Sequence, residues 1–298
     1  MSTRINPNIL PDMIAAIESA QQNAQNAAQQ VSTGRSVNNP GDNPAAVAAL
    51  VINDAQTSQD AQFQTNISDL QSKFQVADSV MNSASQLLTS AISLGTQGAT
   101  GTLTAANRQS IAAQVAGLQQ QLLSLANTTY QGAYIFSGTN VTTPPFTEAS
   151  SAPSGVTYNG KSAVNTDEIS QGQSIQTNLP GDQVFANSTG NAFAALNDLT
   201  NALNSGSGIA AANTEVQNAF NQLNNQRVFY GNSLSQLQST ESFLSQDTVN
   251  LSQQQNTLIG ANLTQAISDL SQSQTAEQAS LSATAQILNL PNLLQYIK

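Results

Sequence analysis

The stretch that decides the fold of this chain is residues 63–91, which read FQTNISDLQSKFQVADSVMNSASQLLTSA. Apolar residues recur in it at alternating steps of four and three, a heptad pattern sustained over about four repeats. The positions of this seam are Phe63, Ile67, Leu70, Phe74, Ala77, Met81, Ala84, Leu88 and Ala91. The spacing predicts a long helix packed in a coiled coil, and the small alanines indicate close helix approach.

The neighbouring residues set the expected limits of this helix. Asn43-Pro44 supplies an amide cap followed by a proline at the first helical position, which favours a helix start. Gly95, Gly98 and Gly101 are expected to interrupt the helix, and Thr104 to cap the next one. The seam of that next helix is Ile111, Val115, Leu118, Leu122 and Leu125. The turn between the two helices predicts an antiparallel hairpin.

A second long heptad pattern occupies the C-terminal part of the chain. It runs through Phe220, Leu223, Tyr230, Leu234, Leu237, Leu244, Leu251 and Leu258. A shorter helix at Phe193–Leu203 and a linker at Ser205–Gly208 precede it. We expect one bundle core, formed by Phe63, Ile67, Leu70, Phe74, Met81, Leu88, Ile111, Val115, Leu118, Leu122, Phe220, Leu223, Leu234, Leu237 and Leu244.

Thinner seams, diluted by alanine, lie at the two ends of the chain. The first helix is expected to start near Pro11 and to end near Gly34, and the C-terminal seam shifts its register near Gly260. Such helices fold poorly alone, so we expect them to order against other subunits. The predicted assembly interface is Leu10, Ile14, Ile17, Ala24, Ala28, Val31, Leu263, Ile267, Leu270, Leu281, Leu288, Leu293 and Leu294.

The middle of the chain, from Tyr130 to Phe185, loses the helical period. Short runs are separated there by turn residues, and Asn159-Gly160 predicts a two-residue hairpin turn. The predicted fold is therefore mainly α with a small β insertion, in an elongated coiled-coil-like bundle built from both terminal regions. Three domains are expected: 1–42 plus 259–298 for assembly, 43–129 plus 190–258 as the helical bundle core, and 130–189 as the β-rich insertion.

Composition excludes several classes of function. Seven basic against 17 acidic residues give a net charge of −10, which opposes nucleic-acid binding. Without cysteine or histidine, disulfides, thiol chemistry and most metal sites are excluded. The longest aliphatic run, Ala45–Ile52, is too short to cross a membrane. The first residues lack a secretory signal pattern, so export would occur without cleavage.

No arrangement of residues predicts catalysis. Asp167 and Glu168 are adjacent acids, but neighbours on a strand point to opposite faces, and a solvated hairpin rim explains them. Serine nucleophiles would need a base, and the few lysines are not placed for that role. We therefore predict no enzyme activity, cofactor or metal. A glycan- or surface-binding module in the β insertion is the remote alternative.

Two separated motifs resemble the signatures of the flagellin superfamily. The N-terminal one is Ser32-Thr33-Gly34-Arg35, then Asn38, then Gly41-Asp42-Asn43-Pro44. The C-terminal one is Leu263-Thr264-Gln265-Ala266-Ile267, then Gln278-Ala279-Ser280-Leu281, then Leu293-Leu294. The resemblance covers about residues 1–146 and 210–298. Two departures are Asn43, which replaces a usual second Asp, and Asn262, which stands where flagellins favour an acid.

Within the superfamily, residues 132–139 (GAYIFSGT) with Pro145-Phe146 resemble the proteins of the junction between hook and filament, because flagellins usually carry an Asn-Gly motif there. The resemblance implies an extracellular structural adaptor joining hook to filament, exported through the flagellar type III apparatus with a dedicated chaperone. Its partners would be copies of itself and the axial proteins on the hook side and the filament side. A short flagellin that builds the filament itself is the alternative.

Overall fold

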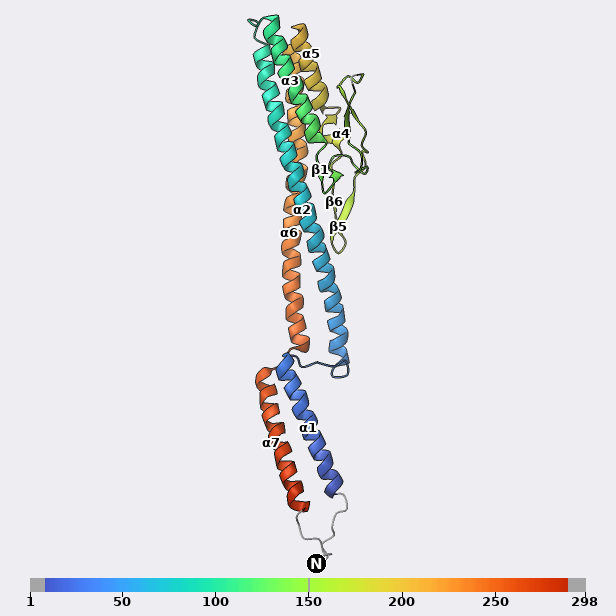
Figure 1. Cartoon of the computed structure of the whole chain (residues 1–298), viewed down its shortest axis with the longest axis vertical. Coiled ribbons are helices and arrows are strands. Elements are labelled where there is room, and N and C mark those ends of the chain that lie inside the picture. The colour runs from blue at the N-terminus through green and yellow to red at the C-terminus, as the bar shows by residue number, and fades with distance from the viewer. Residues whose placement is uncertain (1–8, 150, 289–298) are drawn as a thin grey trace, which may run out of the picture. The chain divides into compact units, whose positions relative to one another are not determined.

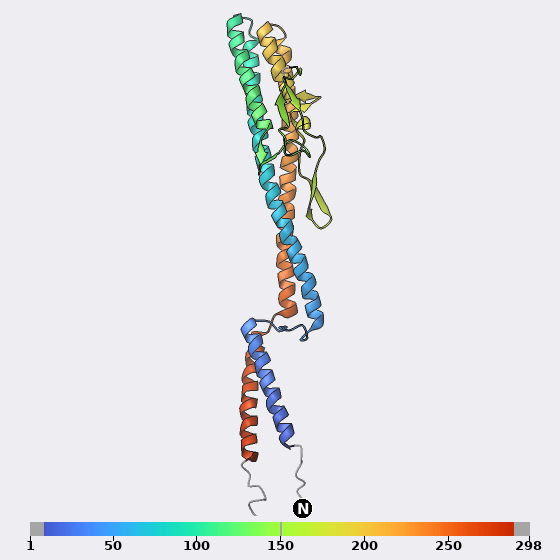
Figure 2. The same ribbon diagram turned by 45° about the vertical axis from the view of Figure 1, so that its right-hand side comes forward.

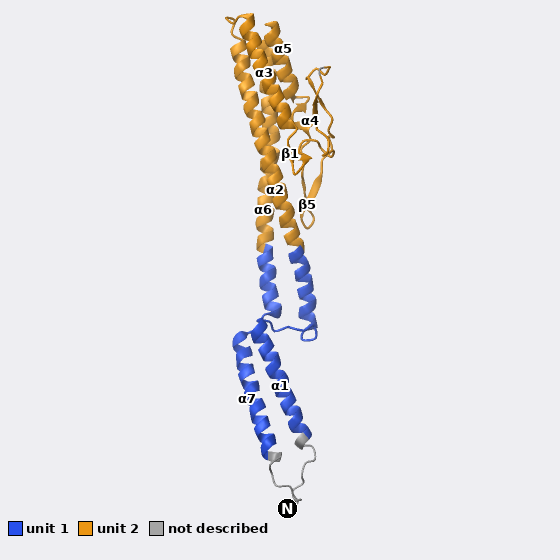
Figure 3. Ribbon diagram, in the orientation of Figure 1, with its two compact units in different colours: residues 1–58, 247–298 blue, residues 59–246 orange. Residues whose placement is uncertain are grey.

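The computed structural model describes residues 9–149 and 151–288, with side-chain environments for residues 11–149 and 151–286. The chain forms two compact units, residues 1–58 with 247–298 and residues 59–246 (Figure 3). These units divide between residues 58 and 59 and between residues 246 and 247, whereas the domain boundaries expected from the sequence are 42/43, 129/130, 189/190 and 258/259. None of the described helices combines the length and hydropathy needed to cross a membrane.

Helices account for most of the described chain. They are α1 (Ile9–Thr33), α2 (Pro44–Gly98), α3 (Ala105–Ala126), α4 (Gly181–Val184), α5 (Ala192–Ser205), α6 (Ile209–Ile259) and α7 (Leu263–Leu288) (Figure 1). The short strands are β1 (Thr129–Tyr130), β2 (Ala133–Tyr134), β3 (Phe146–Glu148), β4 (Val156–Tyr158), β5 (Thr166–Ser170), β6 (Gln173–Gln176), β7 (Ala186–Asn187) and β8 (Gly190–Asn191). The predicted fold class, mainly α with a small β insertion, is confirmed.

The predicted start and stop signals act as helix caps. The side chain of Asn43 accepts a hydrogen bond from the Ala46 amide at 3.1 Å, so α2 starts at Pro44. Thr104 caps α3 by accepting from the Asn107 amide at 3.2 Å. These side chains satisfy amides that have no partner inside their helix. At the end of α1, Gly34 adopts a φ of +69°, which ends the helix at low steric cost.

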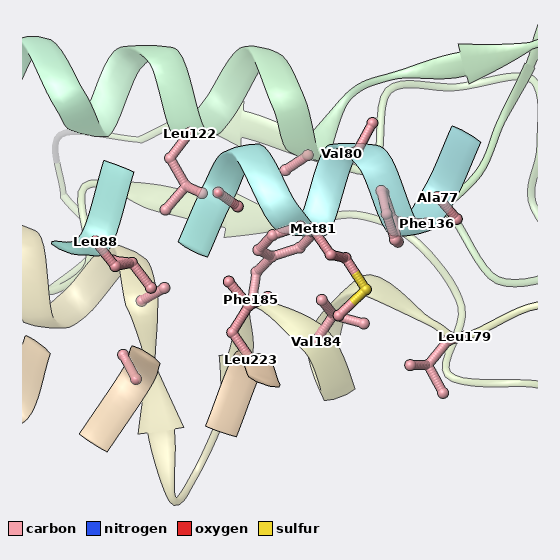
Figure 4. Packing of buried hydrophobic residues seen from close by; sticks show 14 of the residues in the cluster. Ala77, Val80, Met81, Leu88, Leu122, Phe136, Leu179, Val184, Phe185 and Leu223 are labelled. Carbon is pink, nitrogen blue, oxygen red and sulfur yellow. The ribbon is translucent and has the colours of Figure 1, made fainter. Parts of the chain in front are cut away.

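The core of residues 59–246 is a bundle of α2, α3, α5 and α6 (Figures 1 and 2). Every residue of the predicted bundle core packs in it: Leu118, Phe220 and Leu234 are half-buried and the others are buried. Met81, Leu88, Leu122 and Leu223 lie together with Phe185 of the β-rich region (Figure 4).

Polar and aromatic contacts fix the register between α2 and α6. The Arg227 guanidinium donates to both Asp78 carboxylate oxygens, at 3.0 and 3.2 Å. The Phe74 ring meets Tyr230 edge-on, with ring centroids 5.5 Å apart. Burial raises the pKa of Tyr230 above its usual range, so this ring stays neutral. The two helices are thereby held antiparallel in one alignment.

The expectation that Gly95 and Gly98 interrupt the helix is wrong, because α2 continues through both to its end at Gly98. A Cβ on Gly95 would lie 2.3 Å from Asn213 Oδ1 of α6, and one on Gly98 would lie 2.2 Å from Leu203 Cδ2 of α5. These glycines therefore permit close helix approach. Glycine is unfavourable in a helix interior, but the tertiary packing around these two positions outweighs that cost.

The β-rich region contains separate two-stranded antiparallel hairpins: β1–β2, β3–β4, β5–β6 and β7–β8. Aromatic rings hold them to the helices. Phe146 of β3 lies 5.1 Å from Phe193 of α5 and 5.9 Å from Phe185 between ring centroids. Phe136 meets Phe185 edge-on at 5.1 Å. The insertion thus shares its core with the helical bundle.

The predicted hairpin turn at Asn159-Gly160 is wrong. Strand β4 ends at Tyr158 and pairs with β3, which precedes it in the chain, so Asn159-Gly160 does not connect two paired strands. Neither Asn159 nor Gly160 has a positive φ. The Tyr158 hydroxyl donates to the carbonyl oxygens of Phe136 and Lys161 at 3.2 Å each, which holds the segment against an earlier loop. The tight turn is instead Gln131-Gly132, with φ of 49° and 81°, between β1 and β2.

Candidate assembly interface

The terminal helices α1 and α7 lie side by side and antiparallel (Figures 1 and 2). Near the middle of the pair, Gln21 Nε2 donates to Glu277 Oε1 at 2.9 Å. The sequence predicted helices in both places, and it predicted that their thin apolar seams pack against other subunits. The structure adds which side of each helix faces its partner.

The inner seam, where α1 and α7 meet, uses heptad spacing on both helices. Its members, all buried or half-buried, are Met13, Ile17, Ala20, Ala24, Ala27 and Val31 on α1 and Ala266, Leu270, Ser273, Glu277, Ser280 and Thr284 on α7. Only Ala20, Ala27 and Ala266 are buried outright. Because alanine and polar side chains bury little apolar area, this seam stabilises the pair weakly.

Packing along the inner seam is also incomplete. A groove of about 730 Å³ runs between the two helices, lined by alanines and polar side chains such as Ala16, Asn23, Asp269 and Gln272. Because alanines and polar side chains line this groove, few large apolar side chains bridge the two helices along it. The α1–α7 pair is therefore poorly stabilised by its own contacts.

Four large aliphatic side chains of these helices lie outside the inner seam. Ile14 is 54% exposed, Ile267 is 55% exposed and Leu281 is 49% exposed. Leu263, the first residue of α7, is 47% exposed. We call these four residues the outer face. Aliphatic side chains of this size on marginal helices are typical of surfaces that a partner covers.

The predicted interface residues divide between these two surfaces. Ile14, Leu263, Ile267 and Leu281 form the outer face, and Ala28 is also exposed. Ile17, Ala24, Val31 and Leu270 belong to the inner seam. The side chains of Leu10 and Leu288 lie outside the described side-chain environments, and Leu293 and Leu294 lie outside the described residues.

Sequence reasoning missed the three buried alanines of the inner seam. It included Ile14 and Ala28 for their apolar character, although neither lies at a heptad position of the seam that contains Ile17 and Val31. The seven-residue spacing of Ala20 and Ala27 was the signal that identifies the inner seam. In an alanine-rich helix, spacing is more informative than size.

The breaks that end α1 and α6 are joined to each other. The Ser36 amide donates to the Ile259 carbonyl at 2.7 Å, and the Ala261 amide donates to the Gly34 carbonyl at 2.9 Å. Arg35 and Gly260 form an isolated antiparallel bridge between these bonds. The register shift predicted near Gly260 corresponds to a full break between α6 and α7. We call this paired break the joint.

A hydrogen-bonded turn follows the joint and carries the N-terminal signature motif. Asp42 Oδ2 accepts from the amides of Asn39 at 2.8 Å and Asn38 at 3.0 Å. These backbone hydrogen bonds lower the pKa of Asp42 below its usual value. The Asn38 side chain in turn donates to the Arg35 carbonyl at 2.9 Å. The signature residues therefore shape the backbone between α1 and α2.

The two departures from the family pattern both cap helices. Asn43 caps α2, and the Asn262 side chain accepts from the Gln265 amide at 3.2 Å at the start of α7. An amide oxygen serves this purpose as well as a carboxylate does. Neither cap requires a charged side chain.

The acidic pair of the insertion lies on β5 in an exposed segment. Glu168 accepts from the Gly172 amide at 2.7 Å, which closes the turn of the β5–β6 hairpin. Asp167 and Glu168 face different cross-strand partners, Ile175 and Ser174. Within residues 9–149 and 151–288, no three acidic side chains gather in a way that could hold a metal ion.

Comparison with known families matches both ends of the chain. Residues 5–141 match the model of the bacterial flagellin N-terminal helical region, and residues 214–297 match that of the bacterial flagellin C-terminal helical region. Together these regions make up about three-quarters of the chain. The unmatched middle corresponds to most of the β-rich region and α5.

Curated relatives match over most of their length. The chain is 28% identical over 278 residues to flagellar hook-associated protein 3 of Escherichia coli, which covers 85% of this chain and 86% of the relative. It is 26% identical over 275 residues to flagellar hook-associated protein 3 of Salmonella typhimurium, covering 84% of this chain and 85% of the relative.

Solved structures share the fold. A putative flagellar hook-associated protein from Vibrio parahaemolyticus matches with a TM-score of 0.67 at 19% identity, covering 73% of this chain and 99% of that one. The flagellar junction protein FlgL from Legionella pneumophila matches with a TM-score of 0.60 at 16% identity, covering 71% and 100%.

Proposed function

The chain belongs to the bacterial flagellin family, and we propose that within this family it is the structural adaptor that joins the hook of the flagellum to its filament. Both curated relatives are named flagellar hook-associated protein 3, and each matches over nearly its full length. A short flagellin that builds the filament is less well supported, because these relatives carry the name of a hook-associated protein. The role requires assembly and no catalysis.

The observation that carries this proposal is that four large aliphatic side chains of α1 and α7 lie outside the seam between the two helices. Most positions of the inner seam are alanine or polar, and its larger members are Met13, Ile17, Val31 and Leu270. Ile14, Leu263, Ile267 and Leu281 are about half exposed on the outer face. In an isolated helix pair the largest aliphatic residues would face inward. Their exposure supports a surface that further copies of the chain cover.

We infer a division of labour along the chain. Residues 1–42 with 259–298 form the assembly domain, residues 43–129 with 190–258 form the bundle core, and residues 130–189 face outward as the insertion. Leu10, Leu288, Leu293 and Leu294 belong to the same assembly surface by their spacing. The joint supports the first boundary, because α1 ends and α7 begins there.

The proposed partners are copies of the chain and the axial proteins on the hook side and the filament side of the flagellum. The protein would act outside the cell as part of the flagellum. A dedicated chaperone would escort it through the type III export apparatus, because helices with so weak an inner seam expose apolar surface before assembly. No cleaved signal peptide is needed for that route.

A gene deletion tests the proposal and separates it from the flagellin alternative. Cells lacking an adaptor should show hooks without filaments by electron microscopy, while intact flagellin accumulates in the culture medium. If the chain is instead the flagellin of the filament, cells lacking it should release no flagellin into the medium. Complementation with the wild-type gene is the control. Normal filaments on the deletion strain would contradict the proposal.

A further inference from the structure

Charge is distributed very unevenly in the unit formed by residues 1–58 and 247–298. Its described part contains one cation, Arg35, at the joint. The carboxylates of the same part are Asp12, Glu18, Asp42, Asp54, Asp247, Asp269 and Glu277. Copies that associate through α1 and α7 therefore bring like charges together, and Arg35 is the described side chain of this unit that can offset them.

Hydrogen bonds on all sides fix the backbone that carries Arg35. Its amide donates to Thr33 Oγ1 at 3.2 Å, and its carbonyl accepts from the Asn38 side chain at 2.9 Å. The bonds of the joint lie immediately before and after it, at Gly34 and Ser36. A side chain presented from such a fixed backbone loses less freedom when it binds than one on a mobile loop.

The guanidinium of Arg35 is not used within its own chain. Arg35 is exposed, and among the described residues its side chain makes no hydrogen bond or ion pair. By contrast, Arg227 of the other unit is paired with Asp78 at 3.0 Å. Two carboxylates of α1, Asp12 and Glu18, are likewise exposed.

We propose that Arg35 binds a carboxylate on α1 or α7 of a second copy of the chain. The inference rests on the proposed assembly of the terminal helices and names the polar contact within it. Leu263 at 47% exposure lies close to Arg35 in the fold, since Ala261 is bonded to Gly34. A charge beside an apolar contact guides association and fixes its register, because mismatched copies leave the charge unpaired.

Zero-length cross-linking tests this contact in assembled flagella. Arg35→Lys keeps the positive charge and supplies an amine that a carbodiimide joins to a touching carboxylate. We expect a cross-linked dimer in hook–filament preparations from cells that carry Arg35→Lys, with Lys at position 35 joined to α1 or α7 by mass spectrometry. Arg35→Gln should abolish that dimer. Lys161→Gln removes an exposed cation of the other unit and should leave it unchanged.

The outcomes separate this inference from the proposed function. Normal junctions in which the residue at position 35 forms no cross-link, or only cross-links within one chain, would overturn the Arg35 contact alone. Junctions that form equally well with Arg35→Gln and Arg35→Lys at low and high salt would also overturn it. Wild-type chains that are absent from the hook–filament junction would refute the proposed function instead.

Discussion

At the residue scale, Gly260 is the position where the joint tolerates no side chain. A Cβ there would lie 2.3 Å from the Asn256 carbonyl oxygen, a backbone atom that cannot rotate away. We expect Gly260→Ala to destabilise the joint by about 1–3 kcal/mol. The measurement is amide hydrogen exchange at Ser36 and Ala261, which should become roughly tenfold faster or more, in line with that loss.

A matched control for this change lies within α6. A Cβ on Gly231 would meet nothing within 4 Å, and the residue is exposed in the helix interior. Gly231→Ala should stabilise the chain by up to about 1 kcal/mol through helix propensity. It should leave the exchange of Ser36 unaltered. If the Ser36 and Ala261 amides exchange equally fast in Gly260→Ala and Gly231→Ala, the joint does not depend on the absence of a side chain at position 260.

Asp42 makes the signature turn sensitive to acid. Its folded-state pKa is lowered by the amides of Asn39 and Asn38, so its contribution to stability is present above the unfolded pKa of about 3.8. That contribution is lost as the pH falls through the lower folded value. We expect protection of the Asn38 and Asn39 amides from exchange to disappear below pH ~3.8. Asp42→Asn should remove this pH dependence, and its persistence in that variant would assign the transition to another group.

At the element scale, Gly95 lets α2 and α6 approach closely. A methyl group there would lie 2.3 Å from Asn213 Oδ1, and moving that buried side chain would break its 3.2 Å hydrogen bond to Thr96. We expect Gly95→Ala to lower the free energy of unfolding by about 1–3 kcal/mol, although alanine favours the helix. Chemical denaturation monitored by circular dichroism measures the change.

A double-mutant cycle with Asn213→Ala isolates the cause. In the Asn213→Ala background, Gly95→Ala should cost much less, because the new methyl group then meets a shorter side chain. Gly117→Ala in α3 is the control, since a Cβ there meets nothing within 4 Å. If the changes in unfolding free energy caused by Gly95→Ala and Asn213→Ala are purely additive, the destabilisation by Gly95→Ala does not come from a clash with Asn213.

The sequence predicted the long elements well because heptad spacing records which side of a helix is buried. Every member of the predicted bundle core packs in the bundle. The prediction that Gly95 and Gly98 interrupt the helix was wrong, because the effect of a glycine on a helix depends on what packs against it. The same holds for Asn159-Gly160, where contacts of Tyr158 override local turn preference. Contacts between distant segments are not encoded in local spacing.

At the scale of the whole molecule, large apolar residues are buried far more completely in the bundle than in the α1–α7 pair. The bundle buries large residues such as Phe74, Ile67 and Leu223 completely. The α1–α7 pair buries only alanines outright among its described side chains and leaves Ile14, Leu263, Ile267 and Leu281 about half exposed. We therefore expect the bundle to fold as a single copy and, under the proposed assembly, the terminal pair to gain apolar burial when further copies bind.

This separation predicts that the outer face can be altered without loss of folding. Ile14→Ser with Ile267→Ser changes side chains that are 54% and 55% exposed, so thermal unfolding of the monomer should remain nearly unchanged. Filament attachment in the deletion strain should fail, because each half-exposed aliphatic residue would otherwise contribute on the order of 1 kcal/mol per contact when a neighbour covers it. As a control, Leu223→Ala in the bundle should cost about 2–5 kcal/mol of unfolding free energy. If the outer-face variant restores filaments as well as the wild type does, these residues face solvent in the assembled flagellum and the contact between copies lies on another surface.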